Sequence, residues 1–220
     1  MSALIQTIAI SALPVILAIT LHEAAHGYVA RHFGDPTAWQ AGRISLNPLR
    51  HIDPVGTLLV PGLILVTSYL AAGSAMLFGW AKPVPVNFSR LRNPKRDMLW
   101  VAAAGPAINL LMAFGWAAIF KLVWLMPPNL YSVPLSKMSQ IGISVNLVLM
   151  VLNLLPLPPL DGGRIAVSLL PHALAVKFAQ LERWGFPILL LLMFSGILGA
   201  IMWPFVALFQ NLIIILFQLN

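Results

Sequence analysis

The sequence predicts an all-α polytopic membrane protein, a bundle of about five to six membrane helices in one domain that spans residues 1–220. Three observations predict this class. The chain is 60% hydrophobic and only 9% charged, whereas soluble domains carry about 25% charged residues. Its apolar residues gather in long runs, which short polar or proline-rich segments separate. It contains no cysteine, which excludes disulfides, thiol nucleophiles and cysteine-ligated metal centres.

Five apolar runs supply the expected membrane helices. A crossing needs roughly 20 mainly apolar residues, and residues 3–21 meet this length, with a helical pattern that continues to about His32. The other runs are 55–78, 98–126, 141–155 and 184–219. At about 1.5 Å per residue the last run is too long for one crossing. Because Trp203 and Pro204 interrupt it, we expect a tight pair of helices there.

The segments between the runs carry most of the polar residues. Prolines alternate through residues 82–86, and this pattern forbids a helix and favours an edge strand or an extended loop. Residues 163–183 place apolar side chains at helical spacing among basic ones, which is typical of an amphipathic helix at the membrane surface. We therefore expect one short extended or β segment and one interfacial helix outside the bundle.

The basic residues favour a topology in which residues 55–78 do not cross the membrane. If every run crosses, the two sides hold eight and five of the 13 Lys and Arg residues. If residues 55–78 instead re-enter on their own side, the split becomes eleven to two, which satisfies the positive-inside rule far better. Pro61, Gly62 and Gly73 allow such a bend. We predict a re-entrant hairpin and an external N-terminus.

Residues 22–26 read His-Glu-Ala-Ala-His, an HExxH pattern. On a helix, His22 and His26 lie one turn apart on one face, where two imidazoles can bind one Zn²⁺ and Glu23 can act as a general base toward water. Charged residues within a membrane helix are rare and usually functional, and Glu23 is one of only six acidic residues in the chain. The pattern therefore predicts a zinc site within the first helix.

A catalytic zinc ion needs a third protein ligand and an open position, and Asp161 is the strongest candidate. Prolines at 156, 158 and 159 end the fourth run at membrane depth, and backbone freed there must line a cavity. The alternative is a helix-cap role for Asp161. His51 and Asp53 come next, although Asp53 is equally suited to cap a helix. The remaining ligand-type residues are His32, Asp35, Asp97, His172 and Glu182.

Three motifs follow one another along the chain: HEAAH at 22–26, AGPAIN at 104–109 and NLLPLPPLDGG at 153–163. In this order they resemble the site-2 protease family of intramembrane zinc metalloproteases, and they cover the whole of its catalytic core. The sequence has no room for the PDZ or CBS domains of many relatives, so it looks like the short prokaryotic branch of the family.

The resemblance implies an integral, multi-pass protein of the prokaryotic cell membrane. It implies a zinc-dependent endopeptidase that hydrolyses peptide bonds in or near transmembrane segments of other membrane proteins. Carried over by motif, one zinc ion is bound by His22, His26 and Asp161, the general base is Glu23, and the groups that contact substrate backbone or oxyanion are Asn153 and Asn109. For Asn109 the alternative is a hydrogen bond to a neighbouring helix.

Two other functions remain open on the sequence alone. One is a catalytically silent membrane scaffold that keeps a structural zinc ion, and the intact Glu23 argues against it because such a site has no use for a base. The other is a metal transporter with a transit site at His22, His26 and Asp161. A transporter would carry further ligands along a path, and the middles of the other apolar runs hold none.

The expected partners are a membrane-protein substrate with a transmembrane segment and the lipid bilayer. Residues 82–86 either pair with an unwound substrate strand or pack as a static loop over the site. No nucleic-acid module is present, so the net charge of +7 is interpreted as an orientation signal. The sequence does not predict the oligomeric state.

Overall fold

The computed structural model describes residues 2–60, 62–64, 66–67 and 82–219. Within these residues the chain forms helices and no strand, which confirms the all-α class. Four of the described helices are long and apolar enough to cross a membrane, as a multi-pass protein requires. They are α1 (Ser2–His32), whose residues Ala9–His32 meet the criterion, α4 (Pro94–Leu125), α5 (Ser132–Leu154) and α9 (Ile197–Phe217).

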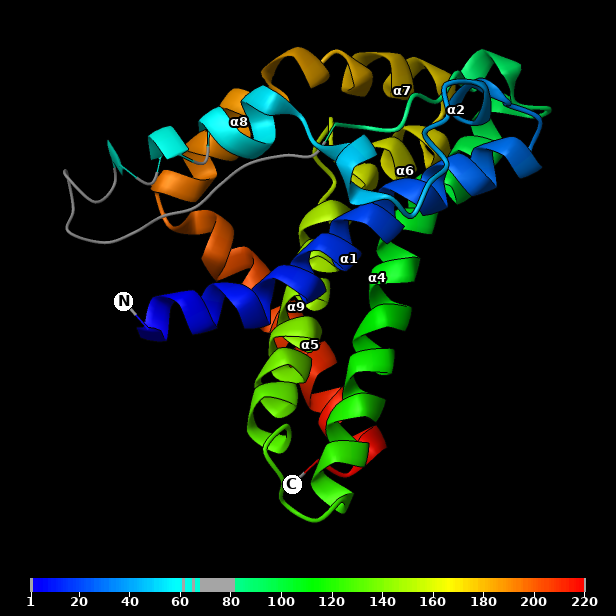
Figure 1. The fold of residues 1–220 in the computed structure, drawn as a ribbon. Helices are drawn as coiled ribbons and strands as arrows, with labels where there is room; N and C mark the ends of the chain where they lie inside the picture. Colours follow the sequence, from blue (N-terminus) through cyan, green and yellow to red (C-terminus); the bar gives the residue numbers. More distant parts are fainter. Residues whose placement is uncertain (1, 61, 65, 68–81, 220) are drawn as a thin grey trace.

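A long α4–α5 hairpin forms the centre of the molecule, and its connecting loop lies at the bottom of Figure 1. Helix α1 packs across both helices near their other end, and α9 packs against both. The main apolar core lies between α4, α5 and α9, where Trp116, Leu147 and Ile213 are buried. At the top of Figure 1, α6 (Asp161–Leu169) and α7 (His172–Ala179) cover the end of the hairpin.

Three of the predicted runs became helices with shifted ends. The run 3–21 lies within α1, the run 98–126 lies within α4 except for its last residue, and the run 141–155 forms the later part of α5, which begins at Ser132 and ends at Leu154. The single interfacial helix predicted for residues 163–183 is wrong, because the chain forms the two short helices α6 and α7 instead. Pro171 separates them; proline has no N–H to donate and disfavours helical backbone in the residue before it.

The last run forms two helices as predicted, but they are divided at a different residue. Helix α8 (Glu182–Phe194) ends before Ser195 and Gly196, and α9 begins at Ile197. Gly196 has a φ of 75°, a left-handed conformation that glycine adopts without steric cost. Pro204, the predicted break, lies inside α9, because a membrane helix tolerates an interior proline when its neighbours satisfy the freed carbonyl.

Short elements connect the long helices at the end of the molecule that holds α6 and α7 (Figure 1). They are α2 (Thr37–Gln40), η1 (Pro48–His51), the π-helical turn η2 (Pro54–Leu59) and η3 (Phe88–Arg90). Residues 82–87 belong to no helix and no strand. The extended-loop alternative for this segment is therefore the one that the chain adopts.

Most of the predicted re-entrant segment, residues 55–78, lies outside the described residues. Its two flanks are described, and they are hydrogen-bonded to each other. The Lys82 N–H donates to the His51 carbonyl at 2.9 Å, and the Asn87 N–H donates to the Asp35 carboxylate at 2.6 Å. The flanks thus lie next to each other in the fold, as a re-entrant path requires, and the path itself stays a prediction.

Candidate metal centre and active site

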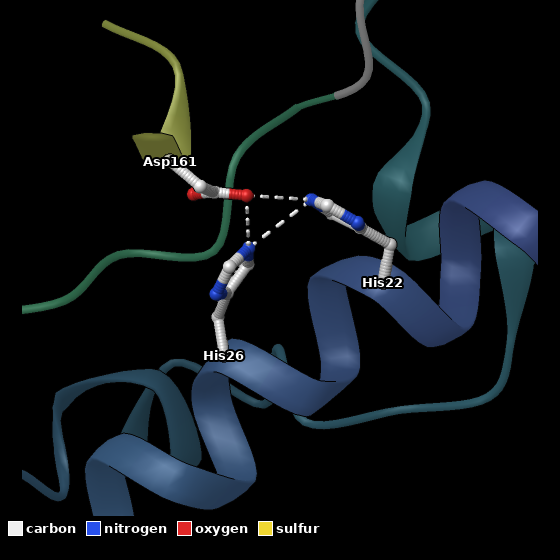
Figure 2. Close-up of side chains that lie close together, drawn as sticks. All are labelled: His22, His26 and Asp161. Atoms are coloured by element: carbon white, nitrogen blue, oxygen red, sulfur yellow. Dashed lines mark hydrogen bonds and ion pairs between the residues drawn. The ribbon is translucent and has the colours of Figure 1, made fainter. Parts of the chain in front are cut away.

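Three ligand-type side chains converge where α1 passes the start of α6 (Figure 2). His22 and His26 lie one turn apart on α1, and Asp161 is the first residue of α6. The two imidazole Nε2 atoms are 3.1 Å apart. Asp161 Oδ2 lies 3.2 Å from Nε2 of His22 and 3.3 Å from Nε2 of His26. All three residues are at most 9% exposed, so the cluster is shielded from bulk water.

The far side of each imidazole ring is hydrogen-bonded, and these bonds fix the ring's tautomer. Nδ1–H of His22 donates to Asn109 Oδ1 at 2.6 Å. Nδ1–H of His26 donates to the Val101 carbonyl at 2.7 Å. A neutral imidazole has one N–H, so each Nε2 atom presents a lone pair to the cluster. Partners of this kind orient the histidine ligands of metal sites.

Two buried amides of the hairpin set the direction of this network. The Asn109 amide nitrogen donates to the Ala18 carbonyl at 3.2 Å and to Asn146 Oδ1 at 2.9 Å. Asn146 in turn donates to the Gly142 carbonyl at 2.8 Å. Because the Ala18 carbonyl can only accept, Asn109 Oδ1 must face His22. The sequence analysis missed Asn146, although an amide side chain in the middle of the apolar run 141–155 was the available signal.

The donor set fits a small divalent cation. Asp161 Oδ2 is buried and accepts no hydrogen bond, and it lies against two nitrogen lone pairs. A tetrahedral ion with ligand bonds of about 2.0–2.1 Å needs donor atoms roughly 3.3 Å apart. The measured separations of 3.1, 3.2 and 3.3 Å match this requirement.

The other ligand-type residues have different partners. The N-cap residue of α6 is Leu160, and Asp161 follows it as the first residue of the helix, so Asp161 does not occupy the cap position that the alternative requires. Asp53 caps η2, since its carboxylate accepts from the N–H groups of Val55 and Gly56. His51 is buried, with its Nε2 2.9 Å from the Ser45 carbonyl. The structure therefore brings together His22, His26 and Asp161 and leaves His51 and Asp53 outside the cluster.

Gly105 lets α4 approach the two imidazoles. A Cβ atom built at this position would lie 2.5 Å from His22 Cε1 and 2.5 Å from His26 Nε2, which is closer than packed carbon atoms approach. Any side chain here would displace the ligand atoms. This contact gives the AGPAIN motif a physical role that the sequence analysis did not assign to its glycine.

Glu23 lies beside the cluster and lines a cavity of about 150 Å³ together with all three ligand-type residues. Its Oε2 atom accepts a hydrogen bond of 2.8 Å from the Val84 N–H in the extended segment 82–87. That segment has few free donors, because Pro83 and Pro85 have no N–H and the N–H of Val84 is committed to Glu23. The packed-loop alternative therefore describes residues 82–86 better than a strand open to pairing.

Asn153 and Asn109 are placed differently with respect to this cavity. Asn153 lines it, and its amide nitrogen donates to the Leu149 carbonyl at 3.0 Å. Asn109 is fully buried, contacts His22 and is not among the described lining residues. Arg164, which the sequence analysis did not single out, also lines the cavity, with its guanidinium 5.2 Å from the centre of the Phe88 ring. The sequence could have indicated Arg164 as a residue of the site, because it lies one helical turn after Asp161.

Comparison with known proteins finds a matching family model and several relatives. The model of peptidase family M50 matches residues 129–196, which include Asp161. A protein of Bacillus subtilis strain 168 named "Putative zinc metalloprotease YwhC" is 40% identical over 195 residues, or 86% of this chain and 82% of the relative. The chain belongs to peptidase family M50. This is the site-2 protease family, and the chain is therefore a multi-pass membrane metalloprotease by membership.

Less similar relatives come from mycobacteria. "Putative zinc metalloprotease Rip2" of Mycolicibacterium smegmatis is 30% identical over 185 residues, which are 84% of this chain and 66% of the relative. The protein of the same name from Mycobacterium tuberculosis strain H37Rv is 30% identical over 161 residues, which are 71% of this chain and 54% of the relative. No solved structure matches the chain.

Proposed function

We propose that this M50 peptidase is a zinc-dependent intramembrane endopeptidase that hydrolyses peptide bonds in or near transmembrane segments of other membrane proteins. One observation carries the proposal. The donor atoms of His22, His26 and Asp161 meet within 3.3 Å of one another, and the carboxylate of Glu23 shares their cavity. A structural metal site needs no such base, so this arrangement favours catalysis over a silent scaffold.

The protein's own groups have separate tasks in this reaction. His22, His26 and Asp161 would hold one zinc ion, and the acceptors on Asn109 and Val101 orient the two imidazole rings. Glu23 takes a proton from the attacking water at its carboxylate and returns it to the leaving amine. The side-chain amide of Asn153, which lines the same cavity, donates to the oxygen of the scissile carbonyl as negative charge develops there. Zinc bound at this site would supply Lewis acidity and lower the pKa of water toward neutrality.

The size of the cavity favours an extended substrate. A helix with its side chains is about 10–12 Å wide, and a cavity of about 150 Å³ is too small for one. The substrate must therefore unwind locally before its backbone reaches Glu23. A transmembrane helix that contains a few residues with weak helix propensity can unwind in this way. Such a substrate lies in the membrane, where it can reach a site on α1, because α1 is a candidate spanning helix.

The compartment follows from charge and from the relatives. The relatives named above are bacterial proteins, so we place the chain in a prokaryotic cell membrane. The eleven basic residues at the end that holds α6 and α7 would face the cytosol by the positive-inside rule. The site then lies near the cytosolic side of the membrane.

A substrate-cleavage assay tests the proposal. The protein is reconstituted in vesicles with zinc and a membrane-spanning reporter, and Glu23→Gln is compared with wild type. Because the amide is nearly isosteric but cannot accept a proton, we expect cleavage to fall by about 10²–10⁴-fold with zinc content unchanged. Glu182→Gln is the matched control, because this substitution removes the same charge from an exposed residue at the start of α8.

Two results would contradict the proposal. Cleavage by Glu23→Gln within a few-fold of wild type would show that another group is the base. Zinc uptake into sealed vesicles without cleavage of any membrane-spanning reporter would favour the transporter.

A further inference from the structure

A second hollow, separate from the cavity at Glu23, is lined by residues that follow α2 in the chain and by Lys82. Its volume is about 320 Å³. Three basic residues and three apolar ones, besides one glycine, line it, and we call it the basic hollow. Its described lining consists of Ala41, Gly42, Arg43, Leu49, Arg50, Ile52 and Lys82. None of these residues is acidic.

The three positive charges of the basic hollow have no ion-pair partner among the described residues. The ion pairs found there involve only His22, His26 and Asp161. Asp53 is the nearest acid along the chain, and it does not line the hollow; its carboxylate accepts from two backbone N–H groups of η2. Three cations side by side without a counter-charge repel one another, and an anion between them would relieve the repulsion.

Backbone carbonyls hold the two arginines in place while leaving most of their N–H groups available. Arg43 Nη2 donates to the Lys82 carbonyl at 2.8 Å, and Arg50 Nη1 donates to the Gly42 carbonyl. A guanidinium has five N–H donors, and Arg43 Nε is buried with no partner. The Lys82 ammonium makes no hydrogen bond with any described residue. The hollow is thus a preformed set of donors.

The surroundings of the basic hollow are apolar and exposed. Leu49, in its wall, is 71% exposed, and Leu46 nearby is 64% exposed. Both follow α1, a candidate spanning helix that ends at His32. Exposed leucines beside basic residues at the end of a spanning helix are typical of a surface at the level of lipid headgroups.

We propose that the basic hollow binds the phosphate of an anionic lipid headgroup. Arginine and lysine donors match phosphate oxygens in charge and geometry, and Leu49 and Ile52 would contact the lipid's apolar part. Free phosphate is also an anion, but it has no apolar part that could contact Leu49 and Ile52. Arg43 also holds the Lys82 carbonyl, two residues before the N–H that Glu23 accepts, so the bound phosphate stabilises the segment that holds the catalytic base.

Native mass spectrometry of the purified chain tests the binding site without any assay of proteolysis. Its failure is therefore distinct from failure of the proposed function. The chain is exchanged into nanodiscs of phosphatidylcholine with phosphatidylglycerol as the minor component, and the retained lipid is identified. We expect wild type to retain phosphatidylglycerol preferentially. Arg50→Gln with Lys82→Gln should weaken this preference by roughly five-fold per charge removed.

Two further variants keep the test interpretable. Lys121→Gln with Lys137→Gln removes the same charge from α4 and α5, and should leave the preference unchanged. Lys82→Gln alone removes no described hydrogen bond of the side chain, so it separates lost binding from lost folding. Displacement of the lipid by millimolar inorganic phosphate in wild type alone would support the phosphate site and assign free phosphate as a second occupant. Equal retention of both lipids by wild type and the double variant would overturn the proposal.

Discussion

The two ends of the α4–α5 hairpin are stabilised by different interactions. Near the metal centre, α4 presents Gly105 and Asn109 to α1. Gly105 is needed for the close approach of the two helices, and Asn109 is needed as a hydrogen-bond acceptor and donor. Toward the connecting loop, the same helix presents Ala113, Trp116 and Ala117 to the apolar core. Apolar packing requires volume and tolerates many side chains. The comparison teaches that changes near the site should alter chemistry, while changes near the loop should alter stability.

The largest effect on chemistry is expected from Gly105→Ala. The new methyl group would overlap the His22 and His26 rings, and these cannot move without losing Asn109 and Val101 as partners. We expect loss of metal binding and a fall in cleavage of at least about 10²-fold. Zinc per chain and cleavage rate measure both. Gly115→Ala is the control on the same helix, since no atom lies within 4 Å of the new methyl group.

A smaller effect is expected from Asn109→Ala, which removes the acceptor of the His22 Nδ1–H. The ring can then rotate or adopt the other tautomer, so we expect zinc affinity to fall by about 10–100-fold. Competition with a chelator measures this affinity. Asn146→Ala removes the next link of the network but leaves the His22 bond intact. If both variants lost the same affinity, the network would act only through stability.

A third prediction concerns the hydrogen bond between Val84 and Glu23. Val84→Pro removes the N–H that Glu23 accepts, whereas Val84→Ala keeps it. A hydrogen bond to a charged group contributes about 1.5–3 kcal/mol, so we expect kcat of the proline variant to fall by about ten-fold or more. KM and zinc content should stay near wild type. Equal activity of the two variants would show that this bond does not position the base.

The smallest effect on chemistry is expected from Gly142→Ala, in the apolar region. A methyl group at Gly142 would overlap the Trp116 ring, and overpacking of this kind costs about 1–3 kcal/mol of stability. Thermal unfolding should show the loss, while zinc content and the cleavage rate per folded chain stay unchanged. A loss of zinc in this variant would contradict the separation between the two ends.

Local patterns predicted most of the helices and singled out His22 and His26 on one helix face, because helix formation and HExxH spacing depend on near neighbours. Asp161 was also within reach, since Pro156, Pro158 and Pro159 marked a break at membrane depth. The boundary between the two helices of the last run was predicted at the wrong residue, because Pro204 is a stronger helix-breaking signal than Ser195 and Gly196. Proline inside a membrane helix is tolerated when packing supplies other partners, and the sequence does not show that packing.

The contacts whose two partners the sequence analysis did not name together join residues far apart in the chain. The bond from Val84 to Glu23 spans 61 residues and the bond from His22 to Asn109 spans 87. Backbone N–H groups such as that of Val84 have no sequence signature at all. The role of Gly105 depends on how closely α4 approaches α1, which only the folded chain defines.

Zinc content per chain is the most direct test of the metal centre. Purified wild-type protein and Asp161→Ala are measured by inductively coupled plasma mass spectrometry after dialysis against trace zinc. Asp53→Asn serves as a matched control, since Asp53 caps η2 away from the cluster. We predict one zinc per chain in wild type and in Asp53→Asn, and little or none in Asp161→Ala. Full zinc occupancy in Asp161→Ala would contradict the assignment of His22, His26 and Asp161 as the ligand set.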